Sequence, residues 1–159
     1  MTNTICFYEP DEAYGFLSNF YGAPLRIDGK AWLTSEHYYQ ASKFESMALQ
    51  QKIQCALTPD EAFSLSREFN HEVKSDWLDI RCDVMRHVVG QKFQQHADLA
   101  LKLASTYPAD LVECSHCDAF WGTGKSGDGL NKLGHILMDV RHQILVQDVL
   151  LSNPGTHHR

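Results

Sequence analysis

Residues 118–141 read D-A-F-W-G-T-G-K-S-G-D-G-L-N-K-L-G-H-I-L-M-D-V-R, and this stretch is the most informative part of the sequence. Four glycines fall within eight residues: Gly122, Gly124, Gly127 and Gly129. From residue 130 onward, apolar residues recur at spacings of three and four, which predicts one face of a helix. A glycine-rich loop that leads into a helix N-terminus is suited to hold an anion. Glycine permits close approach of the backbone, and the first helical N–H groups have no internal partner.

Two familiar phosphate-binding patterns do not account for these glycines. Gly122, Gly124 and Gly127 spell G-x-G-x-x-G, but neither a βαβ context nor an acidic residue at the required distance follows. The phosphate-loop pattern requires a glycine five residues before Gly124, and position 119 is alanine. The stretch therefore belongs to neither of these nucleotide-binding classes.

The stretch resembles the signature of the NADAR family, also called YbiA-like, in the form W-G-x-G-x-x-G-x-G-x-N-x-L-G-x-x-L-M-x-x-R. Three further blocks of that family lie upstream in the same order. They are G-F-L-S-N-F at 15–20, S-E-H-Y-Y-Q-A-S-K-F at 35–44, and a tryptophan and a methionine eight residues apart, Trp77 and Met85. The resemblance covers residues 5–141, and four blocks in the right order make it specific.

Length and composition predict one folded domain. A chain of 159 residues with 43% hydrophobic and 21% charged residues is long enough to bury a sizeable core and has the composition of a globular protein. We expect a helix-rich α+β fold of the YbiA-like type with a few short strands. The domain is expected to span residues 1–151, and the polar tail at 152–159 is expected to be disordered.

Charge and hydropathy favour a small ligand. The net charge of −6 comes from 14 basic and 20 acidic residues, which leaves little surplus for binding polyanions non-specifically. No apolar run reaches the length of a membrane span, and the first residues lack a signal pattern. A cytoplasmic location without a membrane partner is expected, and the sequence indicates no particular oligomeric state.

The five cysteines are expected to be free thiols, because an odd number in a chain without a secretion signal is typical of a reducing compartment. Cys114 and Cys117 have the spacing of half a zinc site. A structural zinc site needs four ligands, and no second closely spaced pair is present. No metal ion and no cofactor are therefore expected.

Short sequence patterns predict where individual helices and strands lie. Asp28-Gly29 lies between two short runs of strand-forming residues, which predicts a hairpin because the turn requires positive φ. Thr58 followed by Pro59 and, three residues after the threonine, Glu61 predicts a helix start. Further helices are expected at 36–47, 76–96, 97–105 and 130–150, and further strands at 4–8 and 111–113.

The predicted helix over 36–47 carries the central pair of charges. Glu36 and Lys43 are seven residues apart, with Gln40 between them on the same face, so their Cα atoms would lie about 10 Å apart. A ligand the size of a sugar would contact both side chains. Most such pairs are solvated surface charges, but both residues lie inside a block that matches the family.

What the resemblance implies is hydrolysis of an N-glycosidic bond. Family members hydrolyse phosphorylated ribosylamino-pyrimidine intermediates of riboflavin biosynthesis, and others remove ADP-ribose from guanine bases of DNA or RNA. In the family mechanism the lysine that matches Lys43 forms a Schiff base with ribose C1′. Glu36 would then transfer protons, and Asp118 would activate water or orient the ribose. A loop-capping role for Asp118 is an equally good interpretation of its position.

The expected partner is a small phosphorylated N-riboside, with ADP-ribosylated nucleic acid as the alternative. A third hypothesis is a non-catalytic module that binds ADP-ribose or another nucleotide; the presence of both Glu36 and Lys43 argues against it. Arginine suits phosphate, although a surface ion pair is the common role of such residues. Trp121 would stack on the base or pack in the core, and Asn131 would bind a hydroxyl or cap the helix. The predicted substrate-binding residues are Ser18, Asn19, Phe20, Arg67, Trp121, Gly122, Gly124, Asn131 and Arg141.

Overall fold

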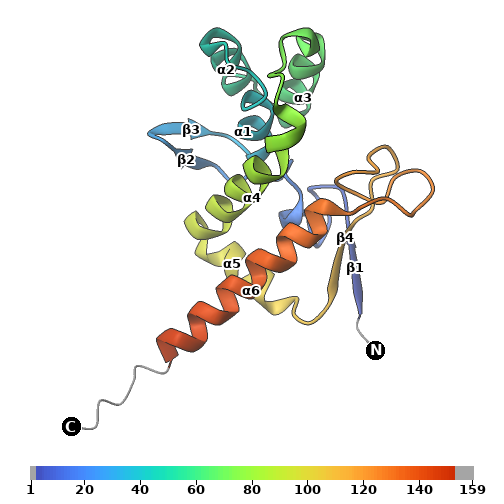
Figure 1. Ribbon diagram of the computed structural model, residues 1–159. Helices are drawn as coiled ribbons and strands as arrows, with labels where there is room; N and C mark the ends of the chain where they lie inside the picture. The colour runs from blue at the N-terminus through green and yellow to red at the C-terminus, as the bar shows by residue number, and fades with distance from the viewer. Residues whose placement is uncertain (1–2, 153–159) are drawn as a thin grey trace.

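The computed structural model describes residues 3–152. The predicted disordered tail at 152–159 lies outside the described residues, except for residue 152, which ends the last helix. The described part is rich in helix and contains two small sheets (Figure 1). This arrangement confirms the prediction of an α+β fold with a few short strands. The elements in chain order are β1 (Thr4–Phe7), η1 (Gly15–Leu17), β2 (Leu25–Ile27), β3 (Lys30–Trp32), α1 (Ser35–Ala41), α2 (Met47–Gln54), α3 (Pro59–Glu68), η2 (Asn70–Glu72), α4 (Trp77–Gln95), α5 (Ala97–Ser105), β4 (Asp110–Glu113) and α6 (Lys132–Ser152).

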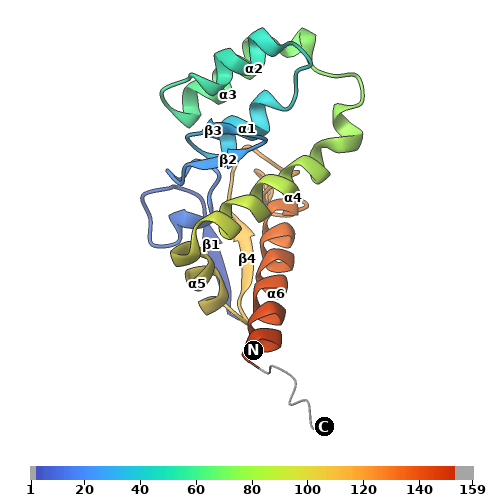
Figure 2. The same ribbon diagram turned by 90° about the vertical axis from the view of Figure 1, so that its left-hand side faces the viewer.

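The first and last strands form a parallel pair, although more than a hundred residues separate them. The register runs from Thr4 opposite Asp110 to Phe7 opposite Glu113. Figure 2 shows this pair beside α6, which packs against β4, α4 and α5. Burial of Phe7 and Leu111 anchors the pair in the core. The carboxyl end of β4 therefore points toward the glycine-rich loop that precedes α6.

The pairing of these strands corrects the expectation about cysteines. Cys6 and Cys114 form a disulfide, with their Cα atoms 5.7 Å apart. In the parallel register Cys6 lies opposite Val112, so Cys114 comes within bridging distance just beyond the end of β4. The prediction of free thiols is wrong for these two residues. The free cysteines are Cys55, Cys82 and Cys117.

The antiparallel hairpin formed by β2 and β3 confirms the prediction from the Asp28-Gly29 turn. Both residues have positive φ, 52° for Asp28 and 77° for Gly29. These values match a two-residue hairpin turn, in which the right-handed twist of the strands selects positive φ. The hairpin places Trp32 in the core, directly before the segment that begins α1.

Helix α1 is shorter than predicted. It ends at Ala41, whereas the sequence predicted a helix over 36–47. The hydroxyl of Ser42 donates to the Tyr38 carbonyl at 2.7 Å, and the Lys43 N–H bonds to a carbonyl three residues back instead of four. This tightening of the last turn ends the helix. The prediction that Lys43 lies on a continuous helix is therefore wrong.

Lys43 instead lies between α1 and α2, where contacts from a distant segment hold its backbone. The Lys43 carbonyl accepts a hydrogen bond from the Lys74 N–H at 2.8 Å. The next residue, Phe44, is fully buried and forms an isolated antiparallel bridge with Val73. The chain just before α4 thus fixes the position of the Lys43 backbone.

The remaining helices agree closely with the sequence predictions. Thr58 caps α3 by accepting from the Glu61 N–H, and Pro59 is its first residue. Helices α4 and α5 match the expected ranges within one residue, and α6 begins two residues later than predicted. Helices α2 and α3 stand side by side at one end of the molecule, above α1 (Figures 1 and 2). None of the helices in residues 3–152 combines the length and the apolar character needed to cross a bilayer.

A fully buried lysine on α4 holds the loop that follows β1. The Lys92 amine donates to the Phe16 carbonyl at 2.6 Å and to the Ser18 carbonyl at 2.9 Å. Burial lowers its pKa to about 7. Together with the hydrogen bond from the Asn19 amide to the Met85 sulfur, these two bonds tie η1 and the two residues after it to α4.

Replacing Lys92 with methionine is expected to destabilise the fold by about 1–3 kcal/mol, because the Phe16 and Ser18 carbonyls lose their shared donor. Urea denaturation would measure the change. Lys125→Met, at an exposed loop position, is the matched control and is expected to stay within about 0.5 kcal/mol of the parent. An equal effect of the two substitutions would contradict an anchoring role for Lys92.

Candidate active site

The first carboxylate of the site lies in the first turn of α1. Glu36 is only 6% exposed, and its Oε1 accepts a hydrogen bond from the Gln40 amide at 2.7 Å. Burial raises the Glu36 pKa to about 7, although the Gln40 hydrogen bond and the Lys43 charge both lower it. The carboxyl group is therefore close to half-protonated near neutral pH, as a group that both donates and accepts protons requires.

The amine of Lys43 is half-buried near the same carboxylate. Its Nζ lies 5.6 Å from the centroid of the Tyr39 ring. Burial lowers the Lys43 pKa, and the positive charges of Arg67 and Arg81 lower it further, while Glu36 opposes them. A lysine with a lowered pKa has a larger fraction of neutral amine, which is the nucleophilic form.

Asp118 has the loop-capping role that the sequence left open, and its charge reaches the candidate site. Its Oδ1 accepts hydrogen bonds from the N–H groups of Phe120 and Trp121 at 2.9 and 2.8 Å, so it caps the loop. Its charge also raises the pKa values of Glu36 and Lys43, which places it near both side chains. The loop cap thus positions a second carboxylate beside the amine.

An aromatic cluster joins the glycine-rich loop to α1. The buried indole of Trp121 donates to the Tyr39 hydroxyl at 3.1 Å, and the two rings meet edge to face with centroids 5.6 Å apart. The ring of Trp77, the first residue of α4, also packs on Tyr39, with the two centroids 5.2 Å apart. Trp121 is therefore a core residue, and it packs on the same tyrosine that the Lys43 amine approaches.

Two glycines of the loop are needed for its shape. A Cβ atom on Gly122 would lie 2.7 Å from the Glu113 carbonyl oxygen, so the loop approaches β4 too closely for any side chain there. Gly124 has φ of 69°, and a Cβ atom on it would lie 2.7 Å from the Ala119 Cβ. The glycines thus allow the loop to pack on β4 and on itself.

The start of α6 does not offer the free donors expected for an anion. The Lys132 N–H bonds to the Phe120 carbonyl and the Leu133 N–H to the Trp121 carbonyl, both at 3.1 Å. Carbonyl groups of the loop thus occupy the donors that an anion would have used. The interpretation of this helix N-terminus as an anion cradle is wrong for these two groups.

Asn131 ties the loop to β4. Its amide oxygen accepts from the Glu113 N–H at 3.0 Å, and its amide nitrogen donates to the Leu111 carbonyl at 3.0 Å. Its φ of 49° is left-handed, a conformation that asparagine tolerates better than most residues. These bonds engage the amide that the sequence suggested for a substrate hydroxyl.

The loop after η1 carries the predicted residues Ser18, Asn19 and Phe20. The Asn19 carbonyl accepts from the Glu36 N–H at 3.2 Å, and its side-chain oxygen accepts from the Ser35 hydroxyl at 2.8 Å. The Ser18 hydroxyl accepts from the Phe20 N–H at 3.1 Å. The loop therefore lies against the first turn of α1, which carries the buried carboxylate of Glu36.

Sequence reasoning missed a third carboxylate. Glu113, the last residue of β4, has a buried Oε2 without a hydrogen-bond partner among the residues that the structure describes. Burial and then the charges of Asp118 and Glu36 raise its pKa to about 8. Its only signal in the sequence was its place at the end of a predicted strand. The three carboxylates do not form a metal-binding group within the described residues.

Arg81 was also missed. Its guanidinium carbon lies 3.4 Å from the centroid of the Phe120 ring, and its charge acts on Lys43 and Tyr39. The available signal was its spacing, since it lies one turn after Trp77 and one turn before Met85 and thus on the same face of α4.

The two arginines predicted to bind phosphate lie in different places. Arg67 is exposed on α3 over the Phe63 ring, and its charge lowers the Lys43 pKa, so it belongs to the site region. Arg141 is buried on α6 and donates to the Thr106 hydroxyl at 3.1 Å and to the Ala109 carbonyl at 2.7 Å. The structure does not bring Arg141 together with the other predicted residues.

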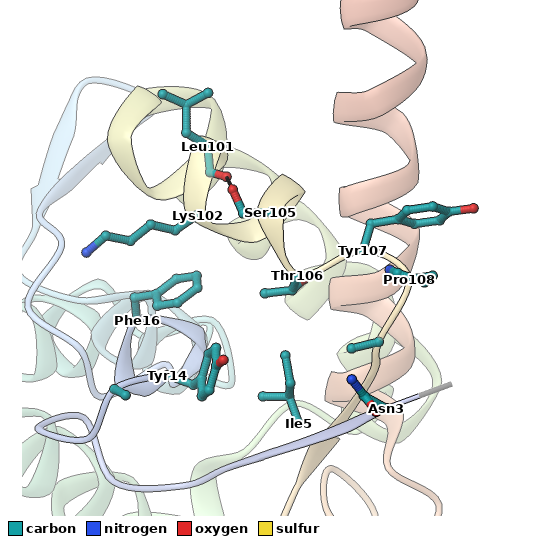
Figure 3. Close-up of a pocket in the computed structure, with 12 residues that line it drawn as sticks. Asn3, Ile5, Tyr14, Phe16, Leu101, Lys102, Ser105, Thr106, Tyr107 and Pro108 are labelled. Atoms are coloured by element: carbon teal, nitrogen blue, oxygen red, sulfur yellow. Dashed lines mark hydrogen bonds between the residues drawn. The ribbon is translucent and has the colours of Figure 1, made fainter. Parts of the chain in front are cut away.

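A cavity of about 790 Å³ lies beside Thr106 and Ala109 (Figure 3). Phe16 and Tyr14 form one wall, and Ile5 of β1 lies across from the end of α5. None of the predicted catalytic or substrate-binding residues lines this cavity. The cluster around Glu36 and Lys43 is therefore a separate region of the molecule.

Sequence and structure comparisons relate the chain to known proteins. The profile of the NADAR domain matches residues 6–145. A riboflavin biosynthesis protein of Vibrio vulnificus is 49% identical over 144 residues, 91% of this chain, and the chain spans 39% of that protein's length. The N-glycosidase YbiA of Escherichia coli is 40% identical over 148 residues, 92% of each chain. The NMR structure of the E. coli protein YbiA matches with a TM-score of 0.87 at 39% identity, over 99% of this chain and 94% of that one.

Proposed function

The chain belongs to the NADAR domain family, and we propose that it hydrolyses the bond between ribose C1′ and an amine nitrogen in phosphorylated ribosylamino-pyrimidines, intermediates of riboflavin biosynthesis. Relatives that align over 92% of both chains are named N-glycosidases, so the chain is a hydrolase of N-glycosyl bonds. The name of the Vibrio relative supports the riboflavin setting. A cytoplasmic location stays a prediction.

The reaction proceeds through the amine of Lys43. Ring opening of a ribosylamine converts its C1′–N bond into an imine. The neutral Lys43 amine adds to C1′, and the aminopyrimidine leaves once its nitrogen is protonated, so that a lysyl imine remains. Water adds to this imine, and collapse of the adduct regenerates the amine and releases the phosphorylated sugar as an aldehyde.

Proton transfer falls to Glu36. With a pKa of about 7, its carboxyl group is available in both forms at neutral pH. The acid form protonates the departing nitrogen, and the carboxylate formed then takes a proton from the attacking water. Burial is the main reason that the acid form stays populated, and the nearby charge of Asp118 adds to this effect.

The observation that carries this proposal is the environment of one amine. Lys43 is half-buried beside an aromatic ring, and two guanidinium groups and burial all lower its pKa. A structural lysine on a surface needs none of these neighbours. Burial and neighbouring cations are the two features that favour the neutral, nucleophilic amine, and Lys43 has both.

Borohydride trapping tests the proposal. Incubation with a ribosylamino-pyrimidine phosphate and sodium borohydride is expected to reduce the imine and leave the sugar phosphate covalently attached at Lys43, as peptide mass spectrometry would show. A parallel incubation uses guanine that carries ADP-ribose. Trapping with the second compound alone would replace the proposed substrate by the ADP-ribosylated one. The absence of an adduct with both compounds, together with tight nucleotide binding, would indicate a binding module instead.

A further inference from the structure

The face of α4 that carries Trp77, Arg81 and Met85 lines the site region at regular one-turn intervals. Trp77 contacts Tyr39, and the Met85 sulfur accepts a hydrogen bond from the Asn19 amide at 3.2 Å. These two residues are engaged with the protein. The arginine between them contacts an aromatic ring, but no hydrogen bond or ion pair of its side chain is found in the described part of the chain.

Arg81 stacks on an aromatic face, and no hydrogen bond from its guanidinium is found among residues 3–152. Its guanidinium carbon lies 3.4 Å from the centroid of Phe120, and its Nε is buried without a hydrogen-bond partner. Neither of the ion pairs found among residues 3–152 includes it. Stacking fixes the plane of a guanidinium while its N–H groups point outward along that plane.

The obvious structural role for such a charge is to neutralise the buried carboxylates, and the electrostatics argue against it. The charges that act on Glu36 are those of Lys43 and acidic residues, and those that act on Glu113 are two carboxylates. Arg81 acts on Lys43 and Tyr39 instead. The guanidinium therefore lies toward the amine and the aromatic cluster.

We propose that Arg81, held flat against Phe120, binds the phosphate group of the substrate and gives the enzyme its preference for phosphorylated sugars. This inference rests on the proposed function, because it takes the ligand at Lys43 to be a ribose that carries a phosphate. A planar fork of N–H donors matches two phosphate oxygens at once. Arg67, also close enough to act on Lys43, supplies a second positive charge from the exposed side.

The test compares ribose 5-phosphate with ribose, by calorimetric or NMR titration of the parent, Arg81→Met, Arg81→Lys and Arg86→Met. The parent is expected to prefer the phosphorylated sugar. Arg81→Met is expected to bind ribose 5-phosphate about 10- to 100-fold more weakly, with little change for ribose. The affinity of Arg81→Lys for ribose 5-phosphate is expected to lie between those of the parent and Arg81→Met, because an ammonium keeps the charge but lacks the planar fork of donors. Arg86, exposed on the same helix and paired with Asp139, is the matched control and should behave like the parent.

Two results would overturn the inference. One is a parent protein that binds the two sugars equally well. The other is an Arg81→Met variant that weakens binding of both by the same factor, which would show that the residue maintains structure. If Arg81→Met does not fold, Arg81→Lys replaces it in the test. An affinity ratio of ribose 5-phosphate to ribose equal to that of the parent would then overturn the inference, and a smaller ratio would support it. Cleavage assays on the phosphorylated and dephosphorylated ribosylamino-pyrimidine separate the two hypotheses: selective sugar binding without cleavage of either compound rejects the proposed function and leaves the phosphate site in place.

Discussion

Lys43→Arg is expected to lower the turnover rate by about 10⁴-fold or more and to abolish borohydride trapping. Arginine keeps the positive charge and most of the length of lysine, but it stays protonated at all accessible pH values and forms no imine. Loss of the attacking nucleophile removes the covalent pathway, and single removals of this kind cost several orders of magnitude in other enzymes. Steady-state kinetics and peptide mass spectrometry would measure both effects.

Lys52→Arg is the matched control for this substitution. Lys52 is exposed on α2, with its amine 5.0 Å from the centroid of the Phe69 ring. The same chemical change there is expected to leave turnover within about twofold, because surface substitutions of this kind rarely disturb a distant site. Retention of covalent trapping in Lys43→Arg would rule out Lys43 as the nucleophile, whatever the change in rate.

The second large effect is expected at Glu36. Glu36→Gln keeps an oxygen that accepts the Gln40 hydrogen bond but cannot transfer a proton, so kcat/KM is expected to fall by about 10²- to 10⁴-fold. In the parent, kcat/KM should decline as the pH rises above about 7, because the acid form that protonates the leaving nitrogen is then lost. The variant should lack this decline. Glu45→Gln, at an exposed position near Lys43, serves as the control and should keep the parent pH profile.

The same carboxyl group links stability to pH. Its folded pKa of about 7 lies above its ordinary value of 4.5, so the folded protein binds more protons than the unfolded chain between these values. The stabilisation from Glu36 is thus complete below about pH 4.5 and is lost as the pH rises through about 7. As the pH rises from 5 to 8, the free energy of unfolding of Glu36→Gln should increase relative to that of the parent, by up to about 3 kcal/mol. A difference that stays constant across this range would contradict the raised pKa.

Signals within a few residues of each other determined several elements from the sequence alone. Asp28-Gly29 specified the hairpin because its turn needs positive φ, and Thr58-Pro59 specified the start of α3 because a cap and a fixed φ act locally. The resemblance to the family blocks selected Glu36 and Lys43 as candidate catalytic residues. These residues share one short segment, so their proximity survived the error in the length of α1.

Only the tertiary structure decided the features that depend on distant segments. Contacts with Val73 and Lys74 hold the chain beyond α1, and parallel pairing of β1 with β4 brings Cys6 to Cys114 across 108 residues. The packing of α4 and β4 brings Arg81 close to Lys43 and Glu113 close to Glu36. Periodicity and caps report the backbone conformation of one segment, whereas the meeting of two segments depends on which buried surfaces fit together. Local sequence therefore specified the candidate acid and amine, and the packed fold supplied the burial and the neighbouring charges that shift their pKa values.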